Sequence, residues 1–170
     1  MKKILKIGIL AFVLMGAACS DDTGKGSEKA VETKAIKDGH VVAVHLGDTF
    51  EDLVHQGKVQ LHNLDKLIQL EKKSDAGEKA DPVTISIFNS QKQELAQNTL
   101  NYDGKVFTFK NEYEGYKGTP KGEFTCGYMS IRGGSVFLES CKDQDGKEIS
   151  TMLAFLGTPK AFRDAEEKAK

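Results

Sequence analysis

Two short turn sequences, Gly133–Gly134 and Asp145–Gly146, constrain the fold of this chain more than any other feature. Each dipeptide tolerates the positive φ angles of a two-residue hairpin loop, so each loop fixes the pairing of the strands beside it. The two loops place the same apolar residues opposite one another, in one row of Met129, Leu138 and Leu153 and a second row of Ile131, Val136 and Phe155. Two independent turns therefore predict one buried face shared by three antiparallel strands.

The same register brings two cysteines face to face. The Gly133–Gly134 loop sets Cys126 opposite Cys141, so an oxidising compartment would join them in a cross-strand disulfide. Alternation counted from this turn makes them a hydrogen-bonded pair, which suits a disulfide less well than a non-hydrogen-bonded pair. A bulge that shifts the register by one residue is therefore an alternative. The bond would close a loop of about 16 residues and contribute about 3 kcal/mol in the chain-entropy description.

Apolar runs and capping residues predict the remaining elements. Strands are expected at His40–Leu46, at Val83–Phe88 and on both sides of Asp103–Gly104, where a type I′ turn would close a hairpin. Asp48 is expected to cap a short helix that Gly57 can end, and Thr158 to cap a final helix over Pro159–Lys170. Residues 58–73 fit both a strand and a helix, and the pattern does not choose between them.

These elements predict a mainly β (α+β) fold. We expect an antiparallel meander forming a small barrel or sandwich in a single domain over residues 39–170, with a short helix near its start and a C-terminal helix. The 170 residues are 39% hydrophobic and 29% charged, which fits one globular domain and excludes a disordered chain or a polytopic membrane protein. The net charge of -1 offers no field that would attract nucleic acid, so we expect no nucleic-acid partner.

The first 18 residues have the features of a targeting segment. Lysines give Met1–Ala18 a positive start, and an apolar run follows over Ile7–Ala18. A run of about 12 residues is too short for a membrane-spanning helix, which needs about 20, but suits the apolar region of a secretory signal.

The end of this segment, Met15-Gly16-Ala17-Ala18-Cys19, resembles the lipobox of bacterial lipoprotein precursors. Gly16 stands where that motif usually has a bulky aliphatic residue. The resemblance implies removal of residues 1–18 and lipidation of Cys19, and Ser20 in place of aspartate implies the outer membrane. An ordinary signal with Cys19 as a free or disulfide-bonded cysteine is the alternative. Lipidation also accounts for the odd count of three cysteines, because it leaves Cys126 and Cys141 as a pair.

The residues after the lipidation site are polar. Val31 and Ile36 are the only large apolar residues between Ser20 and Asp38. So little apolar surface cannot offset the entropy of ordering a chain, so residues 19–38 are expected to be a flexible tether behind the lipidated cysteine.

No catalytic motif is present in the sequence, which contains no phosphate-binding loop, dinucleotide fingerprint, nucleophile elbow or HExxH zinc motif. The histidines have spacings that match no recurring zinc motif and are interpreted as surface or packed side chains: His40, His45, His55 and His62. Asp143–Gly146 contains a fragment of a calcium-binding loop without its later ligands and is interpreted as a hairpin turn. We therefore predict a non-enzymatic protein with no cofactor, no catalytic residues and no metal site.

One connection is a candidate binding loop. Asn111–Gly122 is longer than most hairpin loops and carries Tyr113 and Tyr116, which can supply contact area for a partner. The alternative is that the tyrosines fold back over the end of the barrel or sandwich. The sequence thus predicts an outer-membrane lipoprotein, anchored by its lipid, that acts as a binding or accessory module for a protein partner. Alternatives are an inhibitor of a lytic enzyme such as lysozyme, and a surface-exposed lipoprotein that captures a host protein.

Overall fold

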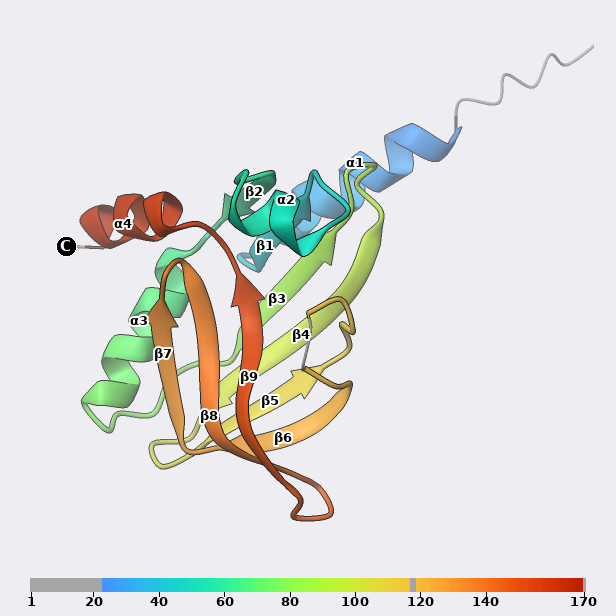
Figure 1. Ribbon diagram of the computed structural model, residues 1–170. Coiled ribbons are helices and arrows are strands. Elements are labelled where there is room, and N and C mark those ends of the chain that lie inside the picture. Colours follow the sequence, from blue (N-terminus) through green and yellow to red (C-terminus); the bar gives the residue numbers. More distant parts are fainter. Residues whose placement is uncertain (1–22, 117–118, 170) are drawn as a thin grey trace, which may run out of the picture.

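The computed structural model describes residues 23–116 and 119–169, and their strands form one mixed sheet that curls into a half-barrel (Figure 1). The elements in chain order are α1 Thr23–Lys37, β1 Val41–His45, α2 Phe50–Val54, β2 Val59–His62, α3 Asp65–Asp75, β3 Val83–Phe88, β4 Glu94–Tyr102, β5 Phe107–Asn111, β6 Gly122–Cys126, β7 Tyr128–Arg132, β8 Ser135–Asp143, β9 Glu148–Leu156 and α4 Pro159–Lys168. The predicted mainly β fold with a short helix near the start and a C-terminal helix is confirmed.

The sheet departs from a pure antiparallel meander at one pair of strands. Its order is β2-β1-β3-β4-β5-β6-β8-β7, with β9 also paired to β8, and β1 runs parallel to β3. The connection between them contains α2, β2 and α3, so the ambiguous residues 58–73 hold both a strand and a helix. A parallel strand is usually covered on both faces. β1 follows this rule, since Val41 and Ala43 face the main core and Val42 and Val44 face a second, smaller one.

The main core fills the concave side of the sheet. Helix α3 buries Leu67, Ile68 and Leu70 there and packs against β3 and β7, which lie on opposite arms of the half-barrel. The Glu71 carboxylate accepts a hydrogen bond of 2.7 Å from the backbone N–H of Ile131, which fastens α3 to β7. Helix α3 therefore closes the opening that the sheet leaves.

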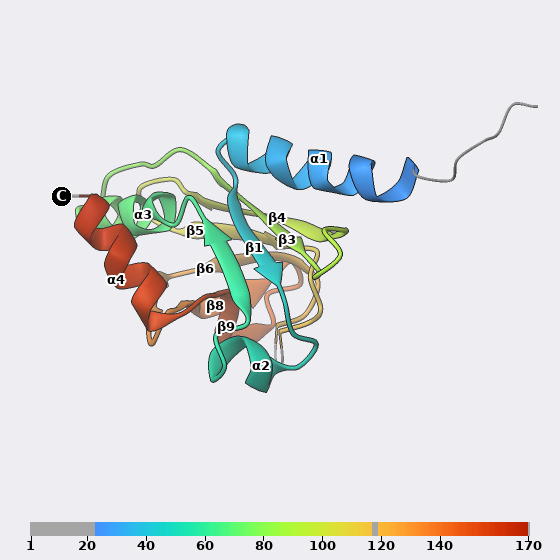
Figure 2. The ribbon, with the colours of Figure 1, turned by 90° about the horizontal axis from the view of Figure 1, so that it is seen from above.

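Most of the segment that was predicted to be a flexible tether forms helix α1. It lies over the convex side of the sheet, where Ala35 packs in the smaller core with Phe88 (Figure 2). Glu32 is also buried, because its carboxylate pairs with Lys92 Nζ at 2.9 Å. The prediction of a tether was wrong over this helix because it counted only large apolar residues. A small alanine and a paired glutamate add to the packing of Ile36 against the smaller core.

Of the two C-terminal turns, Gly133–Gly134 gives the predicted register, whereas Asp145–Gly146 gives one that differs by one residue. The loop at Gly133–Gly134 gives the predicted pairs between β7 and β8, which are Met129 with Leu138 and Ile131 with Val136. On the other side of β8, Val136 faces Phe155 as predicted, but Leu138 faces Met152 rather than Leu153. The difference begins at the turn, where the Asp143 N–H donates to the Lys147 carbonyl, so three residues rather than two form the loop. A bulge in β9 between Phe155 and Leu153 then restores the predicted pairing of Val136 with Phe155.

The hairpin between β4 and β5 has a longer turn than predicted. Tyr102 pairs with Phe107, so four residues form the connection rather than two. The Asp103 side chain accepts hydrogen bonds from the backbone N–H groups of Lys105 and Val106, at 2.8 and 3.0 Å. An aspartate that bonds the following backbone favours this wider turn over the type I′ geometry.

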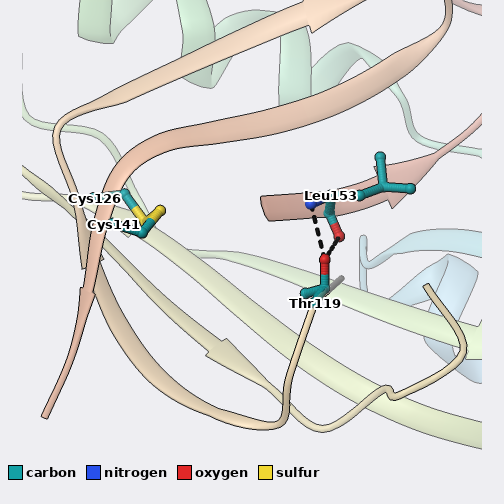
Figure 3. The surroundings of a disulfide bond; sticks show 4 residues. All are labelled: Thr119, Cys126, Cys141 and Leu153. Atoms are coloured by element: carbon teal, nitrogen blue, oxygen red, sulfur yellow. Dashed lines mark hydrogen bonds between the residues drawn. A yellow bond between two sulfur atoms is a disulfide. The ribbon is translucent and has the colours of Figure 1, made fainter. Parts of the chain in front are cut away.

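Cys126 and Cys141 form the predicted disulfide (Figure 3). The β6–β8 and β7–β8 ladders share one register on either side of the cysteines, so no shift is needed. Between the ladders Ser140 has a φ of 54°, a left-handed conformation that interrupts strand alternation. The two cysteine Cα atoms lie 3.9 Å apart. That is the close spacing of a non-hydrogen-bonded pair, so the alternation counted from the turn does not extend to this position.

One of the two predicted helix caps is confirmed, and the other lies one residue later than predicted. Thr158 Oγ1 accepts a hydrogen bond from the N–H of Ala161, as expected for the cap of α4. In α2 the cap is Thr49, whose hydroxyl accepts from the N–H of Asp52, and the predicted cap Asp48 lies one residue earlier. Helix α4 buries Phe162 against the core at the end of β9.

Candidate functional site

A pocket of about 250 Å³ lies at the end of β1, between α2 and the segment Tyr113–Tyr116. Its lining consists of His45, Gly47, Asp48, Thr49, Phe50, Leu53, Asn89, Leu95, Tyr113, Gly115 and Tyr116. Helix α2, the β3–β4 connection and the β5–β6 connection therefore all contribute to it. Only the β5–β6 connection was predicted from the sequence as a candidate binding segment.

His45 forms the polar base of the pocket. It has the same parity in β1 as Val41 and Ala43, so its ring points to the concave side of the sheet. Nδ1 lies 3.3 Å from the Tyr113 hydroxyl and Nε2 lies 3.3 Å from the Tyr116 hydroxyl, so both ring nitrogens have a partner. Burial lowers the pKa of His45 to about 4, which keeps the imidazole neutral at pH 7.

The two tyrosines form an aromatic wall beside this histidine. Their rings meet edge to face with centroids 4.8 Å apart. Burial raises the pKa of the Tyr116 hydroxyl above its ordinary value, and raises that of Tyr113 as well. Gly115 between them is required for close packing, since a Cβ at this position would lie 2.2 Å from the Tyr113 ring.

Buried asparagines hold the connection in this folded-back form. Asn111 Nδ2 donates hydrogen bonds to the carbonyl oxygens of Tyr113 and Pro120, at 2.9 and 2.8 Å. Asn98 Oδ1 accepts a bond of 2.7 Å from the N–H of Glu112. The described part of this connection is therefore fixed to the sheet by side chains from β4 and β5.

Farther along the same connection, Thr119 bonds to the free edge of β9 (Figure 3). Its hydroxyl accepts from the N–H of Leu153 at 2.9 Å and lies 3.2 Å from the carbonyl oxygen of the same residue. One side chain thus replaces a neighbouring strand at this point of the edge.

Tyr113 and Tyr116 do not project into solvent as a binding loop would, and they follow the alternative prediction instead. Tyr116 is only 2% exposed, and Tyr113 is partly buried against His45. Both tyrosines fold back over the end of the half-barrel. Tyr116 supports the pocket from within, while Tyr113 still forms part of its accessible wall.

The pocket has an apolar rim that the sequence analysis missed. Phe50 is 50% exposed and Leu95 is 46% exposed, and both line the pocket, while Leu46 beside His45 is 42% exposed. Two of the five large apolar side chains exposed among the described residues therefore line the pocket. The sequence carried no signal for this rim, because the exposure of Phe50 depends on where α2 lies in the fold.

One residue that lines the pocket and one that is adjacent in sequence to a lining residue are acidic. Asp48 lines the pocket and Glu94 directly precedes Leu95, and neither forms an ion pair within residues 23–116 and 119–169. By contrast, Asp52 in α2 is paired with Lys58 at 2.7 Å. The rim therefore combines apolar contact area with two carboxylates free to meet a cationic group.

The other histidines do not join this site. His40 Nδ1 contacts the Ser86 hydroxyl at 3.0 Å, His55 lies beside Glu51 on the surface, and His62 belongs to β2. In the described part of the chain, no group of three or more His, Cys, Asp or Glu side chains is placed to hold a metal ion.

The acidic turn between β8 and β9 has a structural explanation. The Asp143 side chain accepts hydrogen bonds from the backbone N–H groups of Asp145 and Lys147, at 3.0 and 2.8 Å. This is the hairpin turn that the sequence predicted in preference to a calcium loop.

Comparison with known protein families, with curated proteins and with solved structures gives no match to this chain. Cys19, the predicted lipidation site, lies outside the described residues. Among the helices that are described, none is long and apolar enough to cross a membrane.

Proposed function

We propose that this chain is a lipid-anchored, non-enzymatic module of the bacterial envelope that binds a protein partner. The lipobox-like sequence before Cys19 supports the anchor, and the disulfide between Cys126 and Cys141 suits an exported protein. The outer membrane is the proposed location, because Ser20 follows the cysteine.

The apolar rim of the pocket carries the proposal for binding. A volume of about 250 Å³ accommodates one large side chain, and Phe50 and Leu95 at the mouth would be covered by the partner around it. A buried apolar side chain inserted into a pocket is a common energetic centre of protein interfaces. His45 forms the base and Tyr113 a wall, and their polar atoms already have partners within the protein. The pocket therefore favours an aliphatic or aromatic side chain over a charged one.

The charge of the rim indicates what surrounds that side chain. Asp48 and Glu94 are free of ion pairs in the described chain, so they can face lysine or arginine residues of the partner. Complementary charges of this kind increase the association rate and the specificity. The same observation favours a second candidate, inhibition of a cationic lytic enzyme such as lysozyme. In that case the rim makes the contact, since both tyrosines of the predicted insertion loop fold back.

Capture with matched variants tests the proposal. Mature protein would be immobilised as wild type, as Phe50→Ser with Leu95→Ser, and as the control Tyr128→Ser, which removes an exposed aromatic residue from β7. We expect a partner from an envelope extract to be retained by the wild type and the control and lost from the double variant. Equal retention by all three would reject the rim as the binding site.

Two defined measurements complete the test. Mass spectrometry of the mature protein should show an acylated Cys19, and an unmodified terminus would reject the anchor. Purified protein added to a lysozyme lysis assay addresses inhibition. If the rate of lysis is unchanged, the second candidate is rejected.

A further inference from the structure

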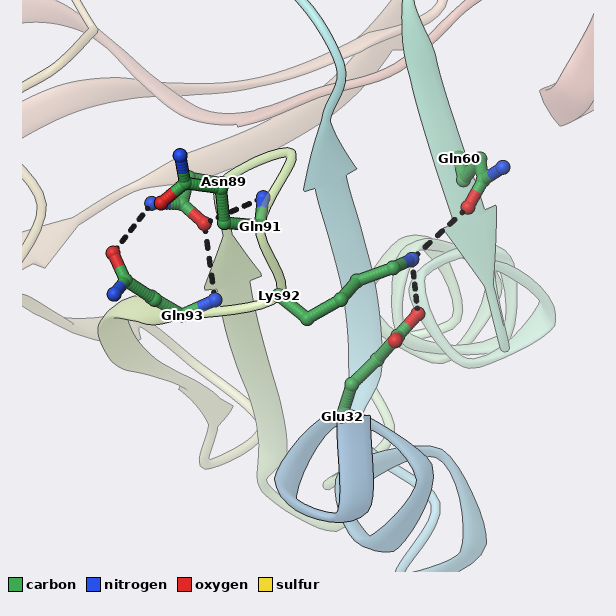
Figure 4. A network of polar contacts seen from close by, with 6 residues as sticks. All are labelled: Glu32, Gln60, Asn89, Gln91, Lys92 and Gln93. Atoms are coloured by element: carbon green, nitrogen blue, oxygen red, sulfur yellow. Dashed lines mark hydrogen bonds and ion pairs between the residues drawn. The ribbon is translucent and has the colours of Figure 1, made fainter. Parts of the chain in front are cut away.

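Helix α1 is fixed to the domain by three kinds of contact. Ala35 packs in the smaller core, and the Glu32 carboxylate accepts from Lys92 Nζ, which also contacts Gln60 Oε1 at 3.3 Å (Figure 4). At the end of the helix, Asn63 Nδ2 donates to the carbonyl oxygen of Ile36 at 3.0 Å. The same amide group donates to the carbonyl oxygen of His40 at 2.8 Å, beyond the helix. These contacts fix the direction of the helix relative to the sheet.

The helix points its N-terminal end to one side of the molecule. In both ribbon views this end projects past the β3–β4 connection and away from α4 (Figures 1 and 2). The β8–β9 turn lies at the opposite end of the sheet (Figure 1). The β3–β4 connection, with Asn89, borders the pocket. The pocket and the N-terminal end of α1 therefore lie toward the same end of β1, on opposite faces of the sheet.

The chain between the helix and the proposed anchor is short. Thr23 begins α1 four residues after Cys19, and four residues span at most about 14 Å when fully extended. The helix itself is about 22 Å long at 1.5 Å per residue. A docked helix with so short a leader restricts how the domain can rotate above a bilayer.

We infer that α1 is a rigid spacer that turns the pocket toward the bilayer holding the lipid anchor, so that the partner is a membrane-bound protein. This inference rests on the proposed function. The partner would present a cationic segment with one protruding apolar side chain close to the bilayer surface. Asp48 and Glu94 favour such a segment over anionic headgroups, which these carboxylates would repel.

Energy transfer to labelled lipid tests the orientation. Acylated full-length mature protein would carry a donor dye on Gln91→Cys in the β3–β4 connection or on Asp145→Cys in the β8–β9 turn, both exposed positions. The vesicles would contain phosphatidylethanolamine and phosphatidylglycerol with a headgroup-labelled acceptor lipid. Because a domain of this size is about 35 Å across, we expect roughly twofold higher transfer from residue 91 than from residue 145.

Two further variants make the result specific. A flexible Gly/Ser linker inserted between Asp22 and Thr23 should bring the two efficiencies together, because it removes the restraint on rotation. Phe50→Ser with Leu95→Ser should leave both transfer efficiencies unchanged, because the proposed rim binds a protein and the vesicles contain only lipid.

Three different results would contradict three different parts of the proposal. Equal or reversed transfer from the two positions in acylated protein overturns the spacer. A loss of the difference in the rim variant shows that lipid itself occupies the rim and overturns the membrane-bound protein as partner. Mass spectrometry before the measurement separates these outcomes from failure of the anchor, because an unacylated Cys19 counts against the proposed function itself.

Discussion

The Tyr116 hydroxyl lies 3.3 Å from Nε2 of His45, and this contact joins the β5–β6 connection to the end of β1 across the opening of the half-barrel. The two residues are 71 positions apart in the chain and both are buried. The pocket exists because this contact holds its base and one wall in a fixed relation.

The neutral state of His45 should make stability depend on pH. Burial lowers its pKa to about 4 from about 6.5 in the unfolded chain, so below pH 6.5 the unfolded state binds a proton that the folded state does not. The stabilisation is fully present above pH 6.5 and falls by up to about 3 kcal/mol as the pH drops to 4. We expect His45→Gln to flatten this dependence in urea unfolding measured at pH 7, 5.5 and 4.5.

The surface residue His55 provides the control for that measurement. His55→Gln should keep the wild-type slope, because this side chain is exposed beside Glu51. Identical slopes for wild type and His45→Gln would contradict the assignment of a buried neutral imidazole.

Gly115→Ala should displace the Tyr113 ring. The added Cβ would lie 2.2 Å from Tyr113 Cζ, well inside contact distance, so the ring must leave its place beside His45. We expect altered imidazole chemical shifts for His45 and weaker capture of the partner, with a loss of stability of about 1–3 kcal/mol typical of overpacking. Tyr113→Phe, which removes only the hydroxyl, should leave the ring in place. An unmoved ring in the alanine variant would show that the backbone yields instead.

Thr119→Val should loosen the edge of β9. Valine has nearly the same shape, but it leaves the N–H and carbonyl of Leu153 without the hydroxyl that now bonds to them. We expect a loss of about 1–3 kcal/mol and faster hydrogen exchange of the Leu153 amide. Thr125→Val on the exposed face of β6 is the matched control, and its effect should be within about 0.5 kcal/mol.

Removing the disulfide should destabilise the domain without changing its register. Cys126→Ala with Cys141→Ala is expected to lower the free energy of unfolding by about 3 kcal/mol, since the bond spans 15 positions. Comparison of oxidised wild type with this variant by urea unfolding measures the effect. A difference near zero would mean that the strand pairing alone holds these residues together.

Local signals in the sequence were enough to predict the C-terminal meander. Gly133–Gly134 fixed the pairing of Met129 with Leu138 and placed Cys126 opposite Cys141. The pairing of Leu138 with Met152 was not predicted, because the turn at Asp145–Gly146 is a three-residue loop held by the Asp143 side chain, and the dipeptide alone does not fix the loop length.

The candidate site was predicted only in part. Tyr113 and Tyr116 stood out in the sequence, but their partner His45 comes from a strand that no local pattern connects to them. The rim residue Phe50 begins the short helix that was predicted after Asp48, and only the tertiary position of α2 leaves it exposed. Pockets built from distant segments depend on topology, and here the parallel pairing of β1 with β3 sets that topology.

The second core beneath α1 limits where the protein can be cut. If the proposed lipid anchor is present, proteolysis in the α1–β1 connection at Gly39 would free the domain from it, but it would also allow α1 to leave. The apolar side chains of Val42, Val44 and Phe88 would then face water on a sheet surface prone to self-association. For a protein held by the proposed anchor, release without exposing this surface therefore requires cleavage before Thr23, with the helix still attached.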